Sequence, residues 1–403
     1  MNPVASPSAS ASKAGQGVLL VLPWGLRHVG GVNQVVEQLG RGLNELPGWR
    51  AQLLVTGPEG IEDRAFPSPL PTTFRELAGP FDGASRTRAV LSFVRRLVPR
   101  VRALARLLRA GDHRTVNVHF PSLGALHFVL LRALGLWQHR LVLSFHLSDA
   151  HLADATTGLE RRLWRLLLAQ ADAIVLPTGD LAVPLRRILP SVDAKVVVVP
   201  NGVDVERMQD PAPPPAPLAI ALGGRRVLLS VGAFQPRKGH ADVMRALAQL
   251  RVAEPALALV VVGTDHAYRA DLERLRTELG LDDDVFFHAN VPHAQLPAFY
   301  QRAELFVLAT AAETFCIAIL EAGAAGLPVV TTHAPGVVEV VRDGETAVMC
   351  PVGDVDAIAT AIRRLLDHPD EAQAMAARLQ SMVAESLTWR HHRARYLRVL
   401  QPA

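Results

Sequence analysis

The stretch Glu313-Thr-Phe-Cys-Ile-Ala-Ile-Leu-Glu321 places two carboxylates on either side of seven mostly small or apolar residues. The continuation, through Gly326-Leu-Pro to Thr331, predicts a helix over residues 315–325, a turn and a buried strand. The unpaired N–H groups at the start of such a helix, at residues 314–317, favour an anion such as a diphosphate. Glu321, a turn or more inside the helix, can accept hydrogen bonds from two vicinal hydroxyls such as those of a ribose. The alternative is a capped helix with two solvated glutamates.

The composition indicates a globular chain of about two domains. It has 403 residues, of which 49% are hydrophobic and 20% charged, so disorder of the whole chain is not expected. No apolar run is long enough to span a membrane without an interrupting Arg, Gly or Pro. Residues 1–17 lack the apolar core of a signal peptide and predict a disordered tail. Cys316 and Cys350 are the only cysteines, which gives no disulfide framework and fits a reducing compartment.

Alternating strands and helices occur twice along the chain. Residues 16–23 predict a strand, Gly30-Gly31 a turn and residues 32–46 a helix, a layout that faces phosphate groups in doubly wound folds. A plain tight turn at the two glycines is the alternative. A second series starts at residues 226–232, and two such series predict two Rossmann-like domains facing each other across a cleft. The remaining expected strands are residues 49–56, 115–120, 140–145, 173–177, 195–199, 258–263, 285–288, 305–308 and 329–332.

Two side chains at the ends of predicted strands are candidates for chemistry. His146 ends an apolar strand, where a histidine most often makes a structural hydrogen bond. Lys238 and Gly239 precede a predicted helix over residues 240–251, where an ammonium group can meet a phosphate. A solvated basic turn is the alternative for Lys238.

No metal site is expected from the sequence. Asp282-Asp283-Asp284 resembles an Asp-x-Asp motif, but its position between a helix and a strand indicates a solvated turn. Asp354 opens a predicted helix, which capping explains. His391-His392 lies in an Arg-rich terminal helix and is expected at the surface, and no His/Cys cluster has ligand spacing.

The segment 313–321 resembles the E-x7-E signature of the retaining GT-B glycosyltransferases of family 4. The similarity continues through Gly326-Leu-Pro-Val-Val330, Gly336-Val-Val-Glu-Val-Val341, Asp343-Gly-Glu-Thr346 and Pro351-Val-Gly-Asp354. It implies the α/β GT-B fold and metal-independent transfer of a hexose-like unit with retention at the anomeric carbon. The donor would be a UDP- or GDP-sugar as co-substrate, with no bound cofactor. The acceptor would be a glycan, glycolipid or lipid-linked sugar in cell-surface polysaccharide or lipopolysaccharide synthesis.

The resemblance also implies a division of the chain and a set of site residues. The expected parts are a tail (1–17), an acceptor domain (18–204), a linker (205–225), a donor domain (226–387) and a helix that crosses back to the first domain (388–403). The residues implied as catalytic are His146, Lys238 and Glu313. Those implied in donor binding are Gly30, Gly31, Arg237, Lys238, Val291, Thr314, Phe315, Cys316, Ile317 and Glu321.

The chain departs from the family pattern after the first strand of the second series. The family often has a cation there, where this chain has Ala233, and Arg237 is the candidate replacement. The resemblance does not require His146 to be a general base, because the leaving phosphate is thought to accept the proton of the acceptor in this family. The protein would then mainly position groups and stabilise the departing diphosphate.

Other functions remain open at this point. A nucleotide-sugar epimerase can share the fold, but it needs additional acid and base residues in the cleft. A non-catalytic partner subunit is disfavoured by the intact Glu313, Glu321 and Lys238, while Ala233 leaves this alternative open. An oxidoreductase is disfavoured because the Gly-x-Gly-x-x-Gly pattern is absent.

A basic segment stands out against the formal net charge of only +4. Residues 86–109 predict a long amphipathic helix, bent at Pro99, with eight arginines and no acid. The arginines are Arg86, Arg88, Arg95, Arg96, Arg100, Arg102, Arg106 and Arg109. We hypothesise that this helix binds an anionic membrane surface; the alternative is that its apolar face packs on the sheet while the arginines are solvated. The expected location is cytoplasmic, with peripheral attachment to the inner face of the plasma membrane under this hypothesis, and no nucleic-acid partner is expected.

Overall fold

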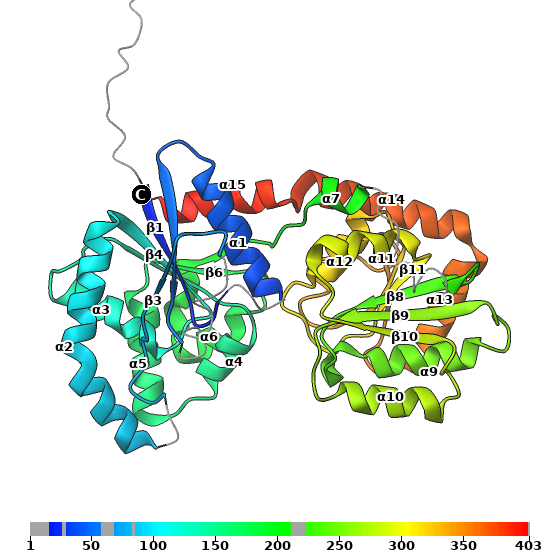
Figure 1. Ribbon diagram of the computed structural model, residues 1–403, viewed down its shortest axis with the longest axis horizontal. Coiled ribbons are helices and arrows are strands. Elements are labelled where there is room, and N and C mark those ends of the chain that lie inside the picture. Colours follow the sequence, from blue (N-terminus) through cyan, green and yellow to red (C-terminus); the bar gives the residue numbers. More distant parts are fainter. Residues whose placement is uncertain (1–15, 26–29, 58–67, 83–84, 211–221, 402–403) are drawn as a thin grey trace, which may run out of the picture.

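A computed structural model describes residues 16–25, 30–57, 68–82, 85–210 and 222–401. Two parallel sheets, each covered by helices on both faces, lie side by side (Figure 1). Most of the tail predicted at residues 1–17 lies outside the described residues, but Gln16 and Gly17 already belong to the first strand.

The first sheet has seven parallel strands within the described residues, in the order β3-β2-β1-β4-β5-β6-β7. The strands are β1 (Gln16–Leu22), β2 (Trp49–Val55), β3 (Thr72–Phe74), β4 (His113–His119), β5 (Arg140–Ser144), β6 (Ala173–Leu176) and β7 (Val196–Val198). The Val- and Leu-rich runs of the central strands are buried because helices cover both faces, whereas Val197 and Val198 of the edge strand β7 are exposed. The strand order reverses between β1 and β4, which opens a crevice at the carboxyl ends of these two strands. The three-residue β3 was not predicted, since it lies in a loop-rich segment.

Alternate residues of the central strands point to two different cores of the first domain. Val18, Leu20 and Leu22 pack against α1 and α15, whereas Leu19 and Val21 face the cluster that includes α2, α3 and α5. The helices of this part are α1 (Gly31–Asn44), α2 (Arg86–Ala110), α3 (Leu126–Ala133), α4 (Ser148–Asp154), α5 (Gly158–Gln170) and α6 (Ala182–Ile188).

The second sheet has six parallel strands in the described residues, in the order β10-β9-β8-β11-β12-β13. They are β8 (Arg226–Val231), β9 (Leu257–Gly263), β10 (Val285–Ala289), β11 (Leu305–Leu308), β12 (Val329–Thr332) and β13 (Val348–Cys350). The flanking helices are α9 (His240–Leu250), α10 (Arg269–Glu278), α11 (Leu296–Arg302), α12 (Ile317–Ala324), α13 (Val355–Asp367) and α14 (Pro369–Ser386). Here the order reverses between β8 and β11, so the second crevice lies next to the loops that carry Lys238 and Glu313.

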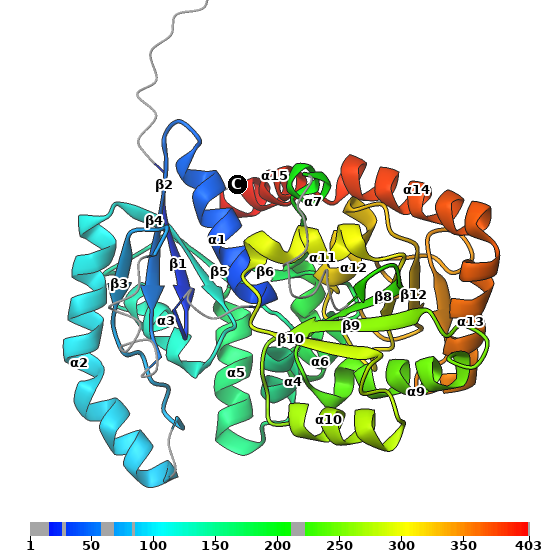
Figure 2. The ribbon, with the colours of Figure 1, turned by 45° about the vertical axis from the view of Figure 1, so that its right-hand side comes forward.

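Two helices connect the domains along one side of the molecule (Figure 2). The segment 205–225, predicted as a linker, begins with α7 (Val205–Gln209), whose Val205 and Met208 are buried in the core of the second domain. The chain returns through α15 (Trp389–Leu400), where the Leu400 carbonyl oxygen accepts a hydrogen bond from the Thr115 hydroxyl at 2.9 Å.

The surface position predicted for His391-His392 is wrong for His392. Its side chain is only 1% exposed, and its Nδ1 lies 2.8 Å from the carbonyl oxygen of Pro200. His392 shares a helical face with Tyr396 and Val399, four and seven residues further on, and this face packs on the first sheet. The arginines of α15 lie outside this buried face.

The acidic turn between α10 and β10 is confirmed as a turn, but Asp284 is not a solvated residue. Its carboxylate pairs with Arg225 at 2.5 Å and lies 3.7 Å from Arg251. Asp354 caps α13 as predicted, because its Oδ1 accepts a hydrogen bond from the backbone N–H of Ala357 at 2.9 Å.

Candidate functional site

The loop that carries Glu313 joins the two domains. The Thr314 hydroxyl donates a hydrogen bond of 2.7 Å to the carbonyl oxygen of His146, on the loop after β5. The Thr178 hydroxyl, after β6, lies 3.2 Å from the carbonyl oxygen of Thr314. These contacts bring two of the predicted site residues, His146 and Thr314, into direct contact across the domain interface.

Glu313 lies at the centre of a charged cluster. The residue is 7% exposed, and its Oε1 accepts hydrogen bonds from Lys238 Nζ at 2.5 Å and from the Thr310 hydroxyl at 3.1 Å. Its Oε2 lies 3.8 Å from Arg237 Nη1, which also donates to the carbonyl oxygen of Ala312. Two cations and one carboxylate therefore meet where the loops after β8 and β11 adjoin, which leaves net positive charge for an anionic ligand.

A glycine sets the position of Lys238. Gly239 has a φ of 68°, and a Cβ added there would lie 1.9 Å from the carbonyl oxygen of Ala309. A side chain at this position would therefore be both strained and too close to the backbone. The close approach brings the β8 loop against the β11 loop, so that Lys238, 14% exposed, reaches Glu313.

The helix predicted over residues 315–325 begins later, at Ile317, and ends at Ala324. Cys316 has a φ of 46°, so the left-handed backbone at this residue separates Phe315 from the helix. No side chain caps the N-terminus of α12. Phe315 and Cys316 are buried, and burial raises the pKa of the Cys316 thiol, which is therefore neutral.

Non-glycine residues with positive φ occur at three loops of the site. Besides Cys316, they are Phe120 with φ 53°, directly after β4, and Leu147 with φ 113°, directly after His146. Such conformations cost about 1–3 kcal/mol each and are found most often at functional sites. The strain therefore supports the assignment of these three loops to one site.

Both carboxylate oxygens of Glu321 are already held in place. Oε1 lies 2.8 Å from Nε2 of His293, and Oε2 accepts a hydrogen bond of 2.8 Å from the Tyr300 hydroxyl. Tyr300 is fully buried, and this burial together with the nearby Glu321 raises the pKa of its hydroxyl. The sequence analysis did not find His293 and Tyr300, because no motif links them to a carboxylate 28 and 21 residues away.

The other predicted residues lie around this centre at different distances. A Cβ on Gly31 would lie 3.4 Å from Cδ1 of Ile317, so the N-terminal end of α1 meets the start of α12 (Figure 1). Gly30 is exposed with open space beside it. Val291 is half-buried against the core of the second domain, and no contact joins it to the charged cluster around Glu313 among the described contacts.

His146 is fixed by its own loop. Its backbone N–H donates to both carboxylate oxygens of Asp149, at 2.9 and 3.0 Å. Burial of the ring, with a smaller contribution from His392, lowers the pKa of His146 to about 3, so its imidazole is neutral at ordinary pH. Its Nε2 lies 3.2 Å from Nδ1 of His119, a buried residue that the sequence analysis missed.

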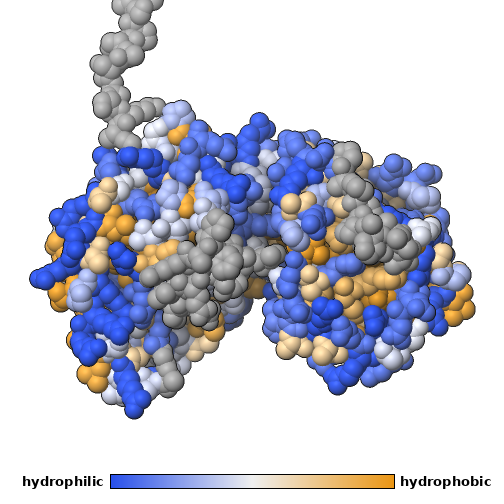
Figure 3. Space-filling model, viewed as in Figure 1, coloured by the Kyte–Doolittle hydropathy of each residue, from blue (hydrophilic) through white to orange (hydrophobic). Residues whose placement is uncertain are grey.

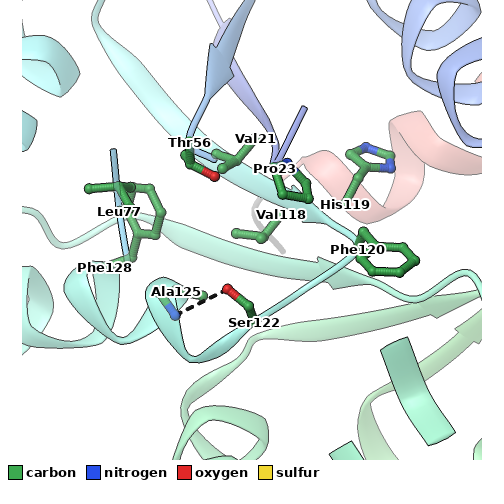
Figure 4. A pocket seen from close by; sticks show the side chains of 11 residues that line it. Val21, Pro23, Thr56, Leu77, Val118, His119, Phe120, Ser122, Ala125 and Phe128 are labelled. Atoms are coloured by element: carbon green, nitrogen blue, oxygen red, sulfur yellow. Dashed lines mark hydrogen bonds between the residues drawn. The ribbon is translucent and has the colours of Figure 1, made fainter. Parts of the chain in front are cut away.

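A small cavity lies beside His119 at the carboxyl ends of β1, β2 and β4 (Figure 4). Its volume of about 20 Å³ is room for one water molecule. The side chains around it are mostly apolar, with Thr56 and Ser122 as the hydroxyl groups.

The comparisons with known proteins agree with this geometry. The profile described as Glycosyltransferase Family 4 matches residues 29–207, and the profile described as Glycosyl transferases group 1 matches residues 220–382. D-inositol 3-phosphate glycosyltransferase 1 of Catenulispora acidiphila is 32% identical over 294 residues, which cover 68% of this chain and 69% of that protein. The chain belongs to glycosyltransferase family 4. The predicted family is thereby confirmed.

One further relative matches over only part of its length, and one solved structure shares the fold. The GDP-mannose-dependent alpha-(1-6)-phosphatidylinositol monomannoside mannosyltransferase of Mycolicibacterium smegmatis is 35% identical over 214 residues, 50% of this family 4 chain and 55% of that protein. The match thus spans little more than half of that relative. The structure of sucrose-phosphate synthase from Thermosynechococcus elongatus has a TM-score of 0.75 at 23% identity and covers 95% of this chain and 98% of that one. The predicted GT-B fold, with two Rossmann-like domains, is confirmed.

Proposed function

We propose that this protein is a retaining, metal-independent glycosyltransferase that moves a sugar from a nucleotide-diphosphate sugar to a glycan, glycolipid or lipid-linked acceptor. The observation that carries the proposal is the meeting of Lys238 and Glu313 of the second domain with the His146 loop of the first. Cations and a free helix N-terminus suit a diphosphate, and buried carboxylates suit sugar hydroxyls. Membership in the family supports the same activity.

Each group then has a definite task. Lys238, Arg237 and the start of α12 would bind the diphosphate and stabilise the charge that develops as it leaves. Glu321 would accept hydrogen bonds from the ribose hydroxyls, and Glu313 would hold the transferred sugar. His146 would contact the reacting centre from the first domain, residues 18–204, which we propose as the acceptor domain. Residues 226–387 would form the donor domain.

The contacts of Glu313 suggest how the donor enters. Lys238 is paired with Glu313, so a bound diphosphate must draw the ammonium group away from that carboxylate. Glu313 would keep the Thr310 hydroxyl and gain hydroxyl groups of the sugar as donors. The exchange replaces one charge-assisted contact by another, which avoids leaving Glu313 buried and unpaired.

The experiment that tests this function is a panel of UDP- and GDP-sugars with the purified protein. GDP-mannose and UDP-glucose come first, because relatives and structural neighbours carry these donors in their names. We expect binding of one donor, release of its nucleoside diphosphate, and an α-linked product from an α-linked donor in NMR spectra. An epimerised donor without acceptor would support an epimerase instead. Absence of binding to every donor would contradict the proposal.

Glu321→Ala is expected to lower the affinity for the nucleoside diphosphate about 10- to 150-fold, the effect of losing a hydrogen bond to a charged group worth about 1.5–3 kcal/mol. The matching 2′,3′-dideoxynucleotide serves as control. The parent protein should bind the dideoxynucleotide more weakly than the ribonucleotide, and the variant should bind the two equally. Calorimetric titration measures both. A variant that still prefers the ribonucleotide would show that Glu321 does not face the ribose.

We also propose that α2 attaches the protein to an anionic membrane, where a lipid-linked acceptor of cell-surface polysaccharide or lipopolysaccharide synthesis would be reached. The C-terminal half of α2 packs on the sheet through Val101, Leu104 and Leu108. In the N-terminal half, Ala89 is buried and Leu97 packs on the same core, but three apolar side chains are exposed: Leu91 by 65%, Val94 by 61% and Val98 by 56%. No helix in the described residues is long and apolar enough to span a membrane.

The exposed ridge of α2 combines these apolar residues with arginine. Arg88, Arg95 and Arg102 are exposed, and each lies three or four residues from Leu91 or Val98, which is helical spacing. Hydrophilic and hydrophobic surface adjoin along this outer edge of the first domain (Figure 3). Arg96 and Arg100 are less available, because both pair with Glu76, at 3.2 and 3.0 Å.

Replacing Arg88, Arg95 and Arg102 together by glutamine is expected to abolish binding to anionic vesicles at low salt, because each basic residue near such a surface contributes about 1 kcal/mol. Nucleotide binding should not change. The matched control replaces three exposed arginines of the second domain, Arg274, Arg342 and Arg364, and should bind vesicles like the parent. Vesicle sedimentation measures the bound fraction. Equal recovery of the parent protein in the supernatant with and without anionic vesicles would refute the attachment.

A further inference from the structure

A chain of hydrogen bonds runs from the last helix of the protein to His146. The Tyr396 hydroxyl lies 3.0 Å from Ser144 Oγ, which lies 2.8 Å from Asn117 Oδ1. Asn117 Nδ2 is 3.0 Å from His119 Nε2, and His119 Nδ1 is 3.2 Å from His146 Nε2. Every member before His146 is buried, with at most 2% of its surface exposed.

The sheet explains why these side chains meet. Asn117 and His119 lie two residues apart on β4 and therefore point to the same face of the sheet. Ser144 is the register partner of His119 on the neighbouring strand β5. Tyr396 on α15 covers this face, and its ring stacks near that of His119, with 6.3 Å between centroids. In Figure 4, His119 lies beside the pale red ribbon of α15.

Only one direction of donation along this series of hydrogen bonds gives every hydroxyl hydrogen an acceptor. In the described part of the protein, the Tyr396 hydroxyl meets Ser144 and Asn117 and no further acceptor. If Tyr396 donates to Ser144, then Ser144 donates to Asn117 Oδ1, and Asn117 Nδ2 donates to His119 Nε2. In the reverse direction one hydroxyl hydrogen, of Tyr396 or of Ser144, is buried without an acceptor, which is costly.

The direction determines the tautomers of both histidines. His119 accepts at Nε2, so its hydrogen is on Nδ1 and is donated to Nε2 of His146. The hydrogen of neutral His146 is then on Nδ1. This nitrogen has no partner among the described protein groups and is the ring atom available to a ligand.

We propose that His119 is a positioning residue that fixes His146 in the tautomer with hydrogen on Nδ1, so that His146 meets its ligand as a hydrogen-bond donor and not as a base. The acceptor on the ligand is an oxygen atom, of a sugar hydroxyl or of a phosphate. Tyr396, on the helix that connects the two domains, sets the direction of donation along the hydrogen-bond series. This inference rests on the proposed function only for the ligand of His146.

The tautomer can be measured without turnover. In protein labelled with 15N-histidine, two-bond 1H–15N correlation distinguishes the protonated from the unprotonated ring nitrogen, and loss of a signal set in His146→Gln assigns His146. We expect a protonated Nδ1 in the parent. In Tyr396→Phe the terminal donor is lost, so we expect a mixture of the two tautomers. A hydrogen on Nε2 of His146 in the parent protein would overturn the proposal, whatever the protein's activity.

Two variants of His119 test the consequence for catalysis. His119→Gln places an amide near the position of Nε2 and cannot donate to His146, so kcat should fall about 10- to 100-fold, by analogy with the loss of a partner that orients a metal-binding histidine. His119→Asn places an N–H donor near the position of Nδ1 and should recover most of this loss. The KM for the donor should change less than about 3-fold in both, since neither contacts the nucleotide.

The outcomes separate this inference from the proposed function. Equal losses of kcat in the Asn and Gln variants, with an unchanged tautomer of His146, would show a merely structural role for His119 and overturn the proposal. Thermal unfolding of both variants checks that they fold. If no nucleotide sugar binds or reacts, the proposed function fails, whereas the tautomer measured by NMR still decides the inference about His119.

Discussion

Replacing Lys238 by alanine is expected to weaken the binding of a nucleoside diphosphate about 10- to 150-fold and to leave the binding of the matching nucleoside unchanged. The ammonium group lies 2.5 Å from Glu313 in a mostly buried site, where a charge-assisted contact to phosphate is strong. A nucleoside has no charge for it to meet. Calorimetric titration of both ligands measures the difference.

The variant needs a control for stability, because Lys238→Ala leaves the Glu313 carboxylate buried with only Thr310 as a close partner and Arg237 at 3.8 Å. The double change Lys238→Ala and Glu313→Gln removes this unpaired charge and should restore the melting temperature but not the affinity for the diphosphate. Arg237→Ala, at a side chain 43% exposed, should have a smaller effect. Equal weakening of nucleoside and nucleoside diphosphate would contradict the phosphate-binding role of Lys238.

Lowering the pH from 6 to 5 is expected to lower the summed free energy of unfolding of the two domains by about 5.5 kcal/mol. The cause is a set of buried histidines with low pKa values. Burial lowers the pKa of His146 to about 3 and those of His113, His240 and His392 to about 4, and it lowers the pKa of His119 well below 6.5.

The sign follows from the protons bound in each state. Between pH 6.5 and about 4 the unfolded chain protonates these five histidines and the native protein does not, so stability is present above pH 6.5 and is lost as the pH falls. Asp149 acts in the opposite sense, because burial raises its pKa from 3.8 to about 7 in the native protein. The net difference from these groups is four protons, and each contributes about 1.4 kcal/mol per pH unit.

Urea unfolding at a series of pH values measures this dependence. Four of the histidines and Asp149 belong to the first domain or to α15, and His240 belongs to the second. The first domain should therefore lose about 4.1 kcal/mol per pH unit and the second about 1.4 kcal/mol. His240→Asn should flatten the dependence of the second domain alone. A free energy of unfolding that is constant between pH 6 and 5 would show that these histidines are protonated in the native protein.

The sequence predicts the fold well because the two sheets are built from uninterrupted apolar runs. Eleven of the strands in the described residues coincide with a predicted strand, and β3 and β13, of three residues each, were not predicted. The boundaries of α12 differ because Cys316 adopts a left-handed backbone, which only its tertiary surroundings require. The burial of His392 follows from its helical face, which the high arginine content of α15 obscures.

The candidate site was predictable only where its residues lie in local motifs. Glu313 and Lys238 lie in loops that follow strands and Glu321 lies inside α12, and local patterns make all three candidates. Their partners come from other elements: Tyr300 holds Glu321 from α11, and His119 contacts His146 from the neighbouring strand. Such pairs are brought together by the order of the strands and by helix packing, and no spacing along the chain encodes them.

The position of α15 has a consequence for the order in which the protein is made. One core of the first domain is completed by Tyr396, Val399 and Leu400, which cover the face of β1 that carries Leu20 and Leu22. These residues leave the ribosome after the whole second domain. The domain that is synthesised first therefore exposes an apolar face of its central strands until α15 has been made, and its core is completed only after the second domain has been synthesised. A chain that ends at residue 388 should show rapid hydrogen exchange at β1 and β5.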